Sequence, residues 1–154
     1  MPKTTQRQPR PRGRFAIVAA EFNKEIVDRL LTGALKAFQK HGVPAKSVSV
    51  IRVPGSLELP LAAQKLAETG RYAAVICLGA VINGETDHYE YVCRGAVNGI
   101  VQAGLSTGVP TIFGVLTCQR MKHARSRSGG KDGNKGYDAA ITALRMAELM
   151  PTLR

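Results

Sequence analysis

The sequence contains no tryptophan, has an aromatic content of 5% and includes only three cysteines among its 154 residues. The cysteines, Cys77, Cys93 and Cys118, are odd in number and far apart, so they indicate neither a disulfide framework nor a zinc site. Two of them lie in apolar stretches, which favours small buried hydrophobic side chains. The pattern therefore predicts a reducing compartment, the cytoplasm.

Long hydrophobic runs are also missing. No apolar run approaches the roughly 20 residues that a membrane-spanning helix needs. Residues 1–14 are polar and basic without an apolar segment, so we expect no secretory signal there. The remaining composition, 44% hydrophobic and 21% charged, is typical of a globular protein with a core of its own.

Acidic residues are scarce, 11 against 22 basic ones, and the formal net charge is +11. Residues 1–14 and residues 118–135 carry nearly all of this excess, while the rest of the chain is close to neutral. A uniformly basic surface would be typical of a nucleic-acid-binding protein, whereas this distribution argues against nucleic acid as the main partner. We expect a disordered basic tail over residues 1–13 and a single domain over residues 14–154.

Apolar runs and helical periodicities alternate along the remainder of the chain. The predicted strands cover residues 15–20, 47–53, 72–82 and 111–116. The predicted helices cover residues 26–38, 57–69, 86–106, 119–126 and 137–150, and the glycine-rich segment 128–136 is expected to be a flexible loop. Alternation of this kind predicts a parallel sheet with helices on both faces and right-handed crossovers.

Open parallel sheets bind ligands beyond the carboxyl ends of their strands, near a point where the strand order reverses. Four loops are expected at that edge. They are residues 20–24, residues 53–58, residues 82–88 and the segment from residue 117 onward. We therefore expect the functional residues to lie in these loops.

The most informative of them is Gly79–His88, which indicates a buried strand, a glycine-containing turn and a helix N-terminus. Free backbone N–H groups and the positive end of the helix dipole favour an anion there. His88 could move protons beside that anion, since an imidazole titrates near neutrality. The segment is neither a P-loop nor a dinucleotide-binding fingerprint. The alternative is that Thr86 is an ordinary helix cap and that His88 is structural.

Two further loops carry candidate ligand-binding groups. Phe22 follows the first strand, where its ring could stack on a flat heterocycle or could instead pack as a hydrophobic staple. Gly55 permits a turn after the second strand, and Glu58 could accept hydrogen bonds from ligand hydroxyls. Glu58 could equally serve to compensate the helix dipole.

Two cations in the C-terminal part are candidates for binding a phosphate. Arg127 could hold a phosphate through two parallel hydrogen bonds. Lys135 stands at a helix start, where a cation opposes the dipole, and this misfit suggests that it faces a ligand or an acid. The alternative is a solvated basic loop.

Together, five motifs in order and spacing resemble the lumazine synthase family, over about residues 14 to 150. They are Phe22-Asn23, Val-Pro-Gly-x-x-Glu-x-Pro at 53–60, Gly-Ala-Val-Ile-x-Gly-Glu-Thr-x-His at 79–88, Phe-Gly-x-Leu-Thr at 113–117, and Arg127 followed by Asn-Lys-Gly at 134–136. The resemblance implies a three-layer α/β/α sandwich around a four-stranded parallel sheet of flavodoxin-like order.

The activity implied by the resemblance is condensation of 5-amino-6-(D-ribitylamino)uracil with 3,4-dihydroxy-2-butanone 4-phosphate. The products are 6,7-dimethyl-8-ribityllumazine, phosphate and water, in the penultimate step of riboflavin biosynthesis, without a metal or redox cofactor. The implied unit is a homopentamer, and the compact glycine-rich turn favours a sixty-subunit shell. A functional link to riboflavin synthase is implied as well.

The resemblance also implies a role for each matching residue. The residues expected to bind the organic substrates are Phe22, Asn23, Ser56, Leu57, Glu58, Val81, Ile82, Asn83, Phe113 and Lys135. The residues expected to bind phosphate are Gly84, Glu85, Thr86 and Arg127. His88 is the expected proton shuttle. Phe113 is expected to come from a neighbouring subunit, and Arg127 and Lys135 to complete a charged rim.

Some positions differ from the family pattern. Ser56 and Leu57 stand where the family often has an alanine and a bulkier residue, and residues 119–125 are basic where the family is usually acidic. Two alternatives to the enzyme remain. One is a non-catalytic scaffold that binds lumazine or flavin or forms a shell, and the other is an RNA-binding protein.

Overall fold

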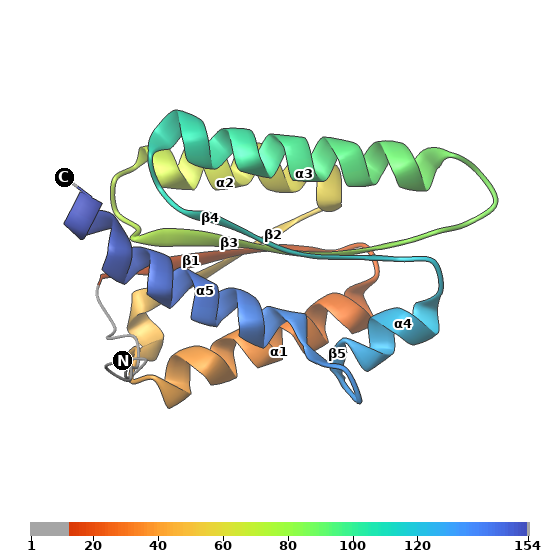
Figure 1. Cartoon of the computed structure of the whole chain (residues 1–154), viewed down its shortest axis with the longest axis horizontal. Coiled ribbons are helices and arrows are strands. Elements are labelled where there is room, and N and C mark those ends of the chain that lie inside the picture. Colours follow the sequence, from red (N-terminus) through yellow and green to blue (C-terminus); the bar gives the residue numbers. More distant parts are fainter. Residues whose placement is uncertain (1–12, 154) are drawn as a thin grey trace, which may run out of the picture.

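The computed structural model describes residues 13–153, in which a four-stranded main sheet is covered by helices on both faces (Figure 1). Helices α2 and α3 cover one face, and α1, α4 and α5 cover the other. The elements are β1 Phe15–Ala20, α1 Lys24–Lys40, β2 Val48–Val53, α2 Leu59–Glu68, β3 Ala74–Ile82, α3 His88–Thr107, β4 Thr111–Cys118, α4 Met121–Ser126, β5 Ser128–Gly130, β6 Gly133–Asn134 and α5 Lys135–Leu149. The predicted tail lies outside the described residues except for Gly13.

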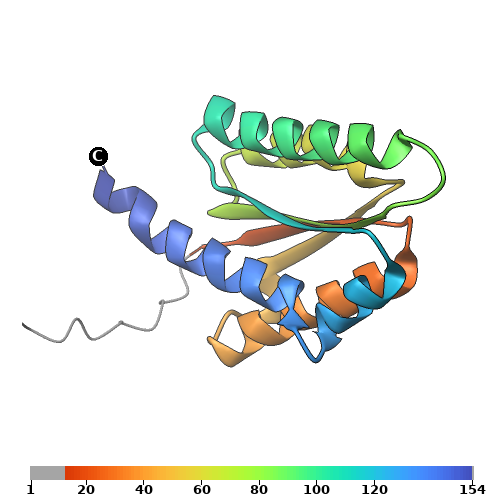
Figure 2. The same ribbon diagram turned by 45° about the vertical axis from the view of Figure 1, so that its right-hand side comes forward.

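The main sheet has four parallel strands in the order β2-β1-β3-β4. Figure 2, turned from the first view, shows the same three layers, so the predicted α/β/α sandwich and its flavodoxin-like order are confirmed. The carboxyl ends of parallel strands lie at one edge of a sheet, and the loops after β1, β2 and β3 therefore come together there. Within residues 13–153, no helix is both long enough and apolar enough to cross a membrane.

The side chains of the inner strands alternate between two apolar clusters. Phe15 and Ile17 of β1 belong to the cluster under α1 and α5, while Ala16 and Val18 belong to the cluster on the other side. The rings of Phe15 and Phe38 contact each other, with 4.9 Å between their centroids. Every residue of β1 is buried, as expected for a strand that is covered on both faces.

The glycine-rich segment 128–136 corrects the prediction of a flexible loop. It forms an antiparallel hairpin of β5 and β6, with Gly129 and Gly133 at positive φ angles of 110° and 86°. The hairpin is fixed by Asn134, whose Oδ1 accepts from Tyr137 N at 3.0 Å while its Nδ2 donates to Arg29 O at 3.1 Å. The same side chain therefore caps α5 and attaches the hairpin to α1.

Two glycines allow α5 and the hairpin to approach α1 this closely. A Cβ built on Gly136 would overlap the carbonyl group of Leu30, and one built on Gly33 would overlap the amide of Asn134. Side chains at these positions are therefore excluded by backbone and amide atoms rather than by flexible groups. The α1–α5 packing depends on both glycines.

The buried thiol of Cys77 gives a direct test of the packing. Burial raises the pKa of Cys77 to about 12, so its thiolate is scarce at neutral pH. We expect an alkylating reagent at pH 8 to leave Cys77 unmodified in the folded protein and to modify it in urea. Peptide mass mapping would measure both, with the half-buried Cys93 as the comparison that reacts first. Rapid modification of Cys77 in the folded protein would contradict the packing.

Candidate active site

A cavity of about 520 Å³ opens at the carboxyl edge of the sheet, and we call it the β3 cleft. It is formed by the loops after β1, β2 and β3 and by the start of α3. The lining residues are Phe22, Pro54, Gly55, Ser56, Leu57, Glu58, Ala80, Val81, Ile82, Gly84, Thr86, His88, Tyr89 and Val92. Its size and its mixed apolar and polar lining suit a small organic ligand.

Phe22 reaches the β3 cleft from the turn that follows β1. Backbone bonds from Glu21 N to Val53 O, at 2.8 Å, and from Phe22 N to Pro54 O, at 3.0 Å, fix this turn against the end of β2. The Phe22 residue is 72% exposed, so its ring does not pack as a hydrophobic staple. Its open face can stack on a flat ligand instead.

Asn23 has a structural task beside the cleft. Its backbone is left-handed, with φ 56°, and its Nδ2 donates to Ala80 O at 2.7 Å. This bond attaches the start of α1 to β3, and Asn23 does not line the β3 cleft. Its predicted contact with substrate therefore stays a prediction.

The residues after β2 form a short 3₁₀ turn, Ser56–Glu58, and α2 begins only at Leu59, two residues later than predicted. Ser56 is buried, and its Oγ would lie 2.6 Å from a Cβ on Gly79, so the turn rests directly on β3. Leu57 is half exposed at the mouth of the cleft. The turn thus presents its backbone and the Glu58 carboxyl to the cleft.

The turn between β3 and α3 gives the cleft its anion-binding character. Helix α3 begins at His88, two residues later than predicted, and Gly84 and Thr86 line the cleft just before it. The hydroxyl of Thr86 accepts from His88 N at 3.3 Å, so Thr86 does help to cap the helix. A hydroxyl that accepts one bond can still donate another, and the helix N-terminus favours an anion beside it.

Asn83 and Glu85 lie outside the lining of the cleft. The Nδ2 of Asn83 donates to Gln119 Oε1 at 2.6 Å, and its backbone N–H donates to Cys118 O at 2.9 Å. These bonds join the ends of β3 and β4. Glu85 is exposed. Substrate contacts of these two residues stay predictions.

A second cavity of about 620 Å³ lies along β4, and we call it the β4 cleft. It contains the three remaining predicted residues, Phe113, Arg127 and Lys135. The complete lining is Phe113, Val115, Leu116, Thr117, Cys118, Gln119, His123, Arg127, Asp132, Lys135 and Asp138. Apart from Asn23, Asn83 and Glu85, which line neither cavity, the predicted site residues are thus divided between two clefts of one subunit.

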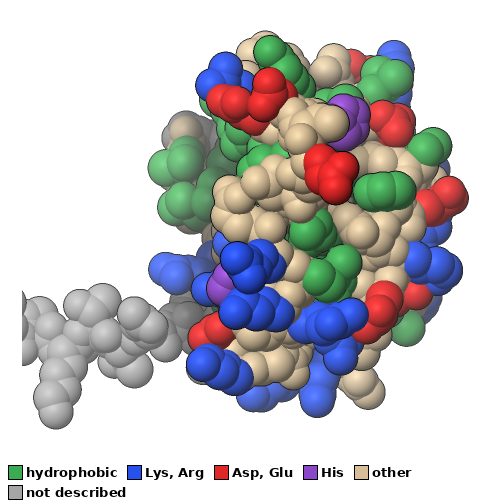
Figure 3. Space-filling model, turned by 90° about the vertical axis from the view of Figure 1, so that its right-hand side faces the viewer, with side chains coloured by type: hydrophobic (Ala, Val, Ile, Leu, Met, Phe, Trp, Pro, Cys, Tyr) green, Lys and Arg blue, Asp and Glu red, His purple; other side chains and the backbone are tan. Residues whose placement is uncertain are grey.

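The charge around this edge of the molecule is uneven. Figure 3 views the carboxyl edge, and Lys and Arg side chains gather on its lower half, the side on which Figure 1 places α1 and α4. The basic residues of the sequence segment 118–135 contribute to this side, since α4 and the hairpin lie there. The lining of the β4 cleft itself is mixed in charge, with Arg127 and Lys135 beside Asp132 and Asp138.

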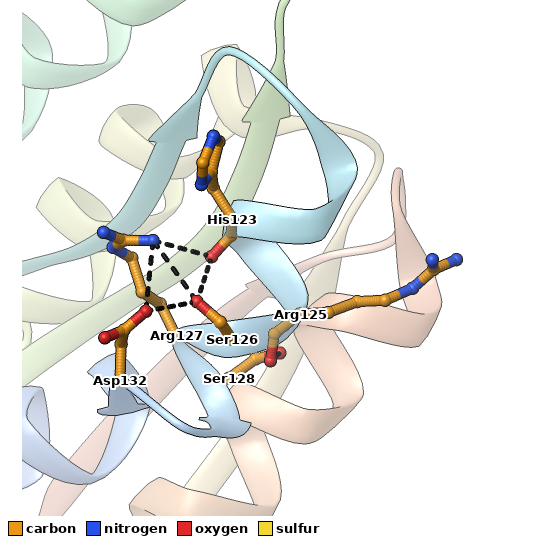
Figure 4. A network of polar contacts seen from close by, with 6 residues as sticks. All are labelled: His123, Arg125, Ser126, Arg127, Ser128 and Asp132. Atoms are coloured by element: carbon orange, nitrogen blue, oxygen red, sulfur yellow. Dashed lines mark hydrogen bonds and ion pairs between the residues drawn. The ribbon is translucent and has the colours of Figure 1, made fainter.

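Arg127 is held at one end of its guanidinium group by three neighbours (Figure 4). Its Nη1 donates to His123 O at 3.2 Å and to Ser126 Oγ at 3.3 Å, and it lies 3.7 Å from Asp132 Oδ2. Ser126 Oγ donates to Asp132 Oδ2 at 2.6 Å. This hydrogen bond is the main cause that lowers the pKa of Asp132, and the positive charges of Arg127 and Lys131 add to it.

The two predicted cations are also joined through their backbones. The N–H of Lys135, the first residue of α5, donates to the carbonyl of Arg127 at 2.9 Å. Lys135 lines the β4 cleft together with Asp138. A lysine at this helix start therefore has both a cavity and an acidic residue in its vicinity, and its contact with a ligand stays a prediction.

Sequence reasoning missed Tyr89 and Asp132. Tyr89 lines the β3 cleft, and burial raises its pKa while its hydroxyl interacts with Cys93 and Thr117. Two features of the sequence could have indicated Tyr89 as a lining residue. It is next to His88, and Val92, about one helical turn later in α3, lines the same cleft. Asp132 could have been noticed as the one acid within the basic segment 118–135. Among the described residues, no group of three or more His, Cys, Asp or Glu could hold a metal ion.

Comparison with known proteins identifies the family to which this chain belongs. Residues 12–151 match the sequence profile of 6,7-dimethyl-8-ribityllumazine synthase. A protein of that name from Halorhodospira halophila is 53% identical over 140 residues, covering 91% of this chain and 90% of the relative. The one from Salinibacter ruber is 52% identical with the same coverage. A chloroplastic one from Arabidopsis thaliana is 51% identical over 136 residues, 88% of this chain and 60% of its own. This chain belongs to the 6,7-dimethyl-8-ribityllumazine synthase family.

Proposed function

We propose that the protein condenses 5-amino-6-(D-ribitylamino)uracil with 3,4-dihydroxy-2-butanone 4-phosphate to form 6,7-dimethyl-8-ribityllumazine, phosphate and water. The family supports this reaction. The observation that carries it is the β3 cleft, in which an exposed aromatic ring, a carboxyl group, a helix N-terminus and an imidazole line one cavity. Those groups match a flat heterocycle, a polyol chain, a phosphate and a proton-transfer step.

The β3 cleft accommodates the pyrimidine and its ribityl chain. Phe22 stacks on the heterocycle, and the backbone of Ser56 and Leu57 with the Glu58 carboxylate holds the ribityl hydroxyls. Val81 and Ile82, the last two residues of β3, contact the edge of the pyrimidine. Since backbone groups make most of these contacts, Ser56 and Leu57 are compatible with the role despite their departure from the family pattern.

The phosphate and the proton transfers belong to the turn before α3. Gly84, Glu85 and Thr86 offer backbone N–H groups to the phosphate. The amino group of the pyrimidine attacks the ketone, and loss of a first water gives an imine. Phosphate is then eliminated, the second amine attacks the remaining carbonyl, and loss of a second water closes the ring. His88 moves protons for the dehydration and the elimination.

The β4 cleft serves the active site of a neighbouring subunit in this proposal. Phe113, Arg127 and Lys135 line a cavity different from the one that contains His88. A ring in which the β4 cleft of one subunit meets the β3 cleft of the next brings all these groups together. We take the unit to be a pentamer, and the compact hairpin at residues 128–134 favours a sixty-subunit shell.

We place the enzyme in the cytoplasm and link it to riboflavin synthase. Its cysteines are all free thiols, as suits a reducing compartment. The lumazine product is the compound that a riboflavin synthase consumes. Light scattering would measure the mass of the assembly, and a mass equal to a single subunit would contradict the shared site.

The function is tested by mixing the purified protein with both substrates in a buffer without added metal. Lumazine fluorescence and inorganic phosphate should rise together in a 1:1 ratio. A scaffold that only holds ribityl heterocycles would bind the product without releasing phosphate. A nucleic-acid-binding protein would bind RNA with a steep dependence on salt that survives Arg127→Ala. Either of the last two results, without turnover, would contradict the proposal.

A further inference from the structure

We propose that Asp132, acting through Ser126, is a positioning residue that fixes one end of the Arg127 guanidinium so that its other edge faces phosphate. The inference rests on the proposed function, because the phosphate role of Arg127 belongs to that proposal. It adds a residue that has no place among the groups expected from the resemblance. The contacts in Figure 4 carry it.

Among the described residues, a single nitrogen makes all the hydrogen bonds and the ion pair of the Arg127 guanidinium. Nη1 meets His123 O, Ser126 Oγ and Asp132 Oδ2. Within residues 13–153, Nη2 and Nε make no hydrogen bond or ion pair with protein atoms. These two nitrogens form one edge of the planar group, with parallel donors that suit two oxygens of a phosphate.

Asp132 is itself fixed in place. Its backbone N–H donates to Ser126 O at 2.9 Å, and its Oδ2 accepts the Ser126 hydroxyl at 2.6 Å. It stands between β5 and β6 of the hairpin, which Asn134 attaches to α1. The carboxylate is therefore in position before any ligand arrives, and it lowers the entropy that Arg127 would otherwise lose on binding.

The distances indicate that Asp132 orients Arg127 rather than neutralising it. The short bond of the carboxylate goes to Ser126, while Arg127 Nη1 is 3.7 Å away. Lys135 and Asp138 line the same cleft with opposite charges, and the positive charges of both Arg127 and Lys131 act on Asp132. The cations around Asp132 therefore outnumber it. An anion therefore still finds an attractive site beside Arg127.

Solvent exposure separates this role from a role in stability. The side chains of Arg127 and Asp132 are 45% and 42% exposed, and ion pairs at such exposure contribute little to folding. Removal of the carboxylate should therefore affect ligand binding much more than the unfolding midpoint.

The test is Asp132→Asn, which keeps the shape and removes the charge. We expect the KM for the butanone phosphate to rise about tenfold, as for loss of one charge-assisted contact, with kcat changed less than about twofold. The urea midpoint should be unchanged. Glu68→Gln, which removes an exposed charge from the pair with Lys65 on α2, is the matched control and should behave as wild type.

Two further variants separate positioning from a merely structural effect. Asp132→Asn added to Arg127→Ala should have no additional effect on KM, because the group being positioned is gone. Ser126→Asp combined with Asp132→Ala should restore most of the affinity, since residue 126 already contacts the same Nη1. Wild-type KM in Asp132→Asn, or an equal loss in the Arg127→Ala background, would overturn the inference.

Binding of inorganic phosphate, measured by calorimetry on the assembled protein, distinguishes this inference from the proposed function. Weaker phosphate binding in Asp132→Asn than in wild type supports positioning even if no lumazine is formed, in which case only the proposed function fails. Normal turnover together with unchanged KM and unchanged phosphate affinity would leave the function standing and refute the role of Asp132.

Discussion

Gly136→Ala should destabilise the domain by about 3 kcal/mol or more, because the new Cβ would overlap the backbone carbonyl of Leu30. The usual gain from alanine in a helix, roughly 1 kcal/mol, is too small to compensate. A backbone carbonyl cannot rotate away as a side chain can, so α5 would have to separate from α1. Urea unfolding followed by circular dichroism would measure the loss as a lower midpoint.

Gly84→Ala is the control for this prediction. A Cβ at Gly84 has no neighbour within 4 Å, so the unfolding midpoint should stay close to that of wild type. Equal midpoints for Gly136→Ala and wild type would show that the two helices can separate without cost, contrary to the packing described here.

His88→Ala and Arg127→Ala should each strongly lower activity at substrate concentrations below the KM, yet a mixed assembly of the two should regain activity. His88→Ala is expected to lower kcat about 10²-fold, as for loss of a general acid–base group. Arg127→Ala is expected to raise the KM for the phosphorylated substrate by about 10- to 100-fold, as for loss of hydrogen bonds from a charged donor. The two side chains line different clefts, so neighbouring subunits can supply one intact partner each.

In a ring assembled at random from equal amounts of both variants, about a quarter of the sites would join an intact His88 to an intact Arg127. Co-expression with two different affinity tags, followed by purification over both, would yield such rings. Each variant carried alone through the same procedure is the control. Activity of the mixed rings no higher than the average of the two variants would place both residues in the site of one subunit.

The strands could be predicted because each is an apolar run with clear ends. The run Phe15–Ala20 was expected and found with the same bounds. The starts of α2 and α3 were placed two residues too early, because Ser56–Glu58 and the turn before His88 adopt local structures that the helical pattern does not distinguish. The hairpin was missed because its glycines indicate a loop, while the bonds that order it, such as the long-range bond from Asn134 to Arg29, depend on the folded structure.

The candidate site could be predicted wherever a residue follows directly on a strand. Phe22, Glu58 and His88 come to one cleft because parallel strands end at one edge. The sequence pattern could not place Arg127 and Phe113 in a separate cleft, since that depends on how α4 and the hairpin fold back along β4. In the sequence, Asp132 contributes only one negative charge to a basic segment. Its hydrogen bond with Ser126 depends on the fold of the hairpin and could not be predicted from the sequence pattern.

The bond between Asn134 and Arg29 spans 105 positions of the chain, and the α5 helix that it caps covers one face of the sheet. A polypeptide still emerging from the ribosome has β1, β2 and β3 long before it has this cover. Contacts of such separation form late and slowly, since a long loop must be closed first. The part of the apolar face that α5 covers therefore stays uncovered until α5 has been synthesised, and chaperones should bind the nascent chain up to that point.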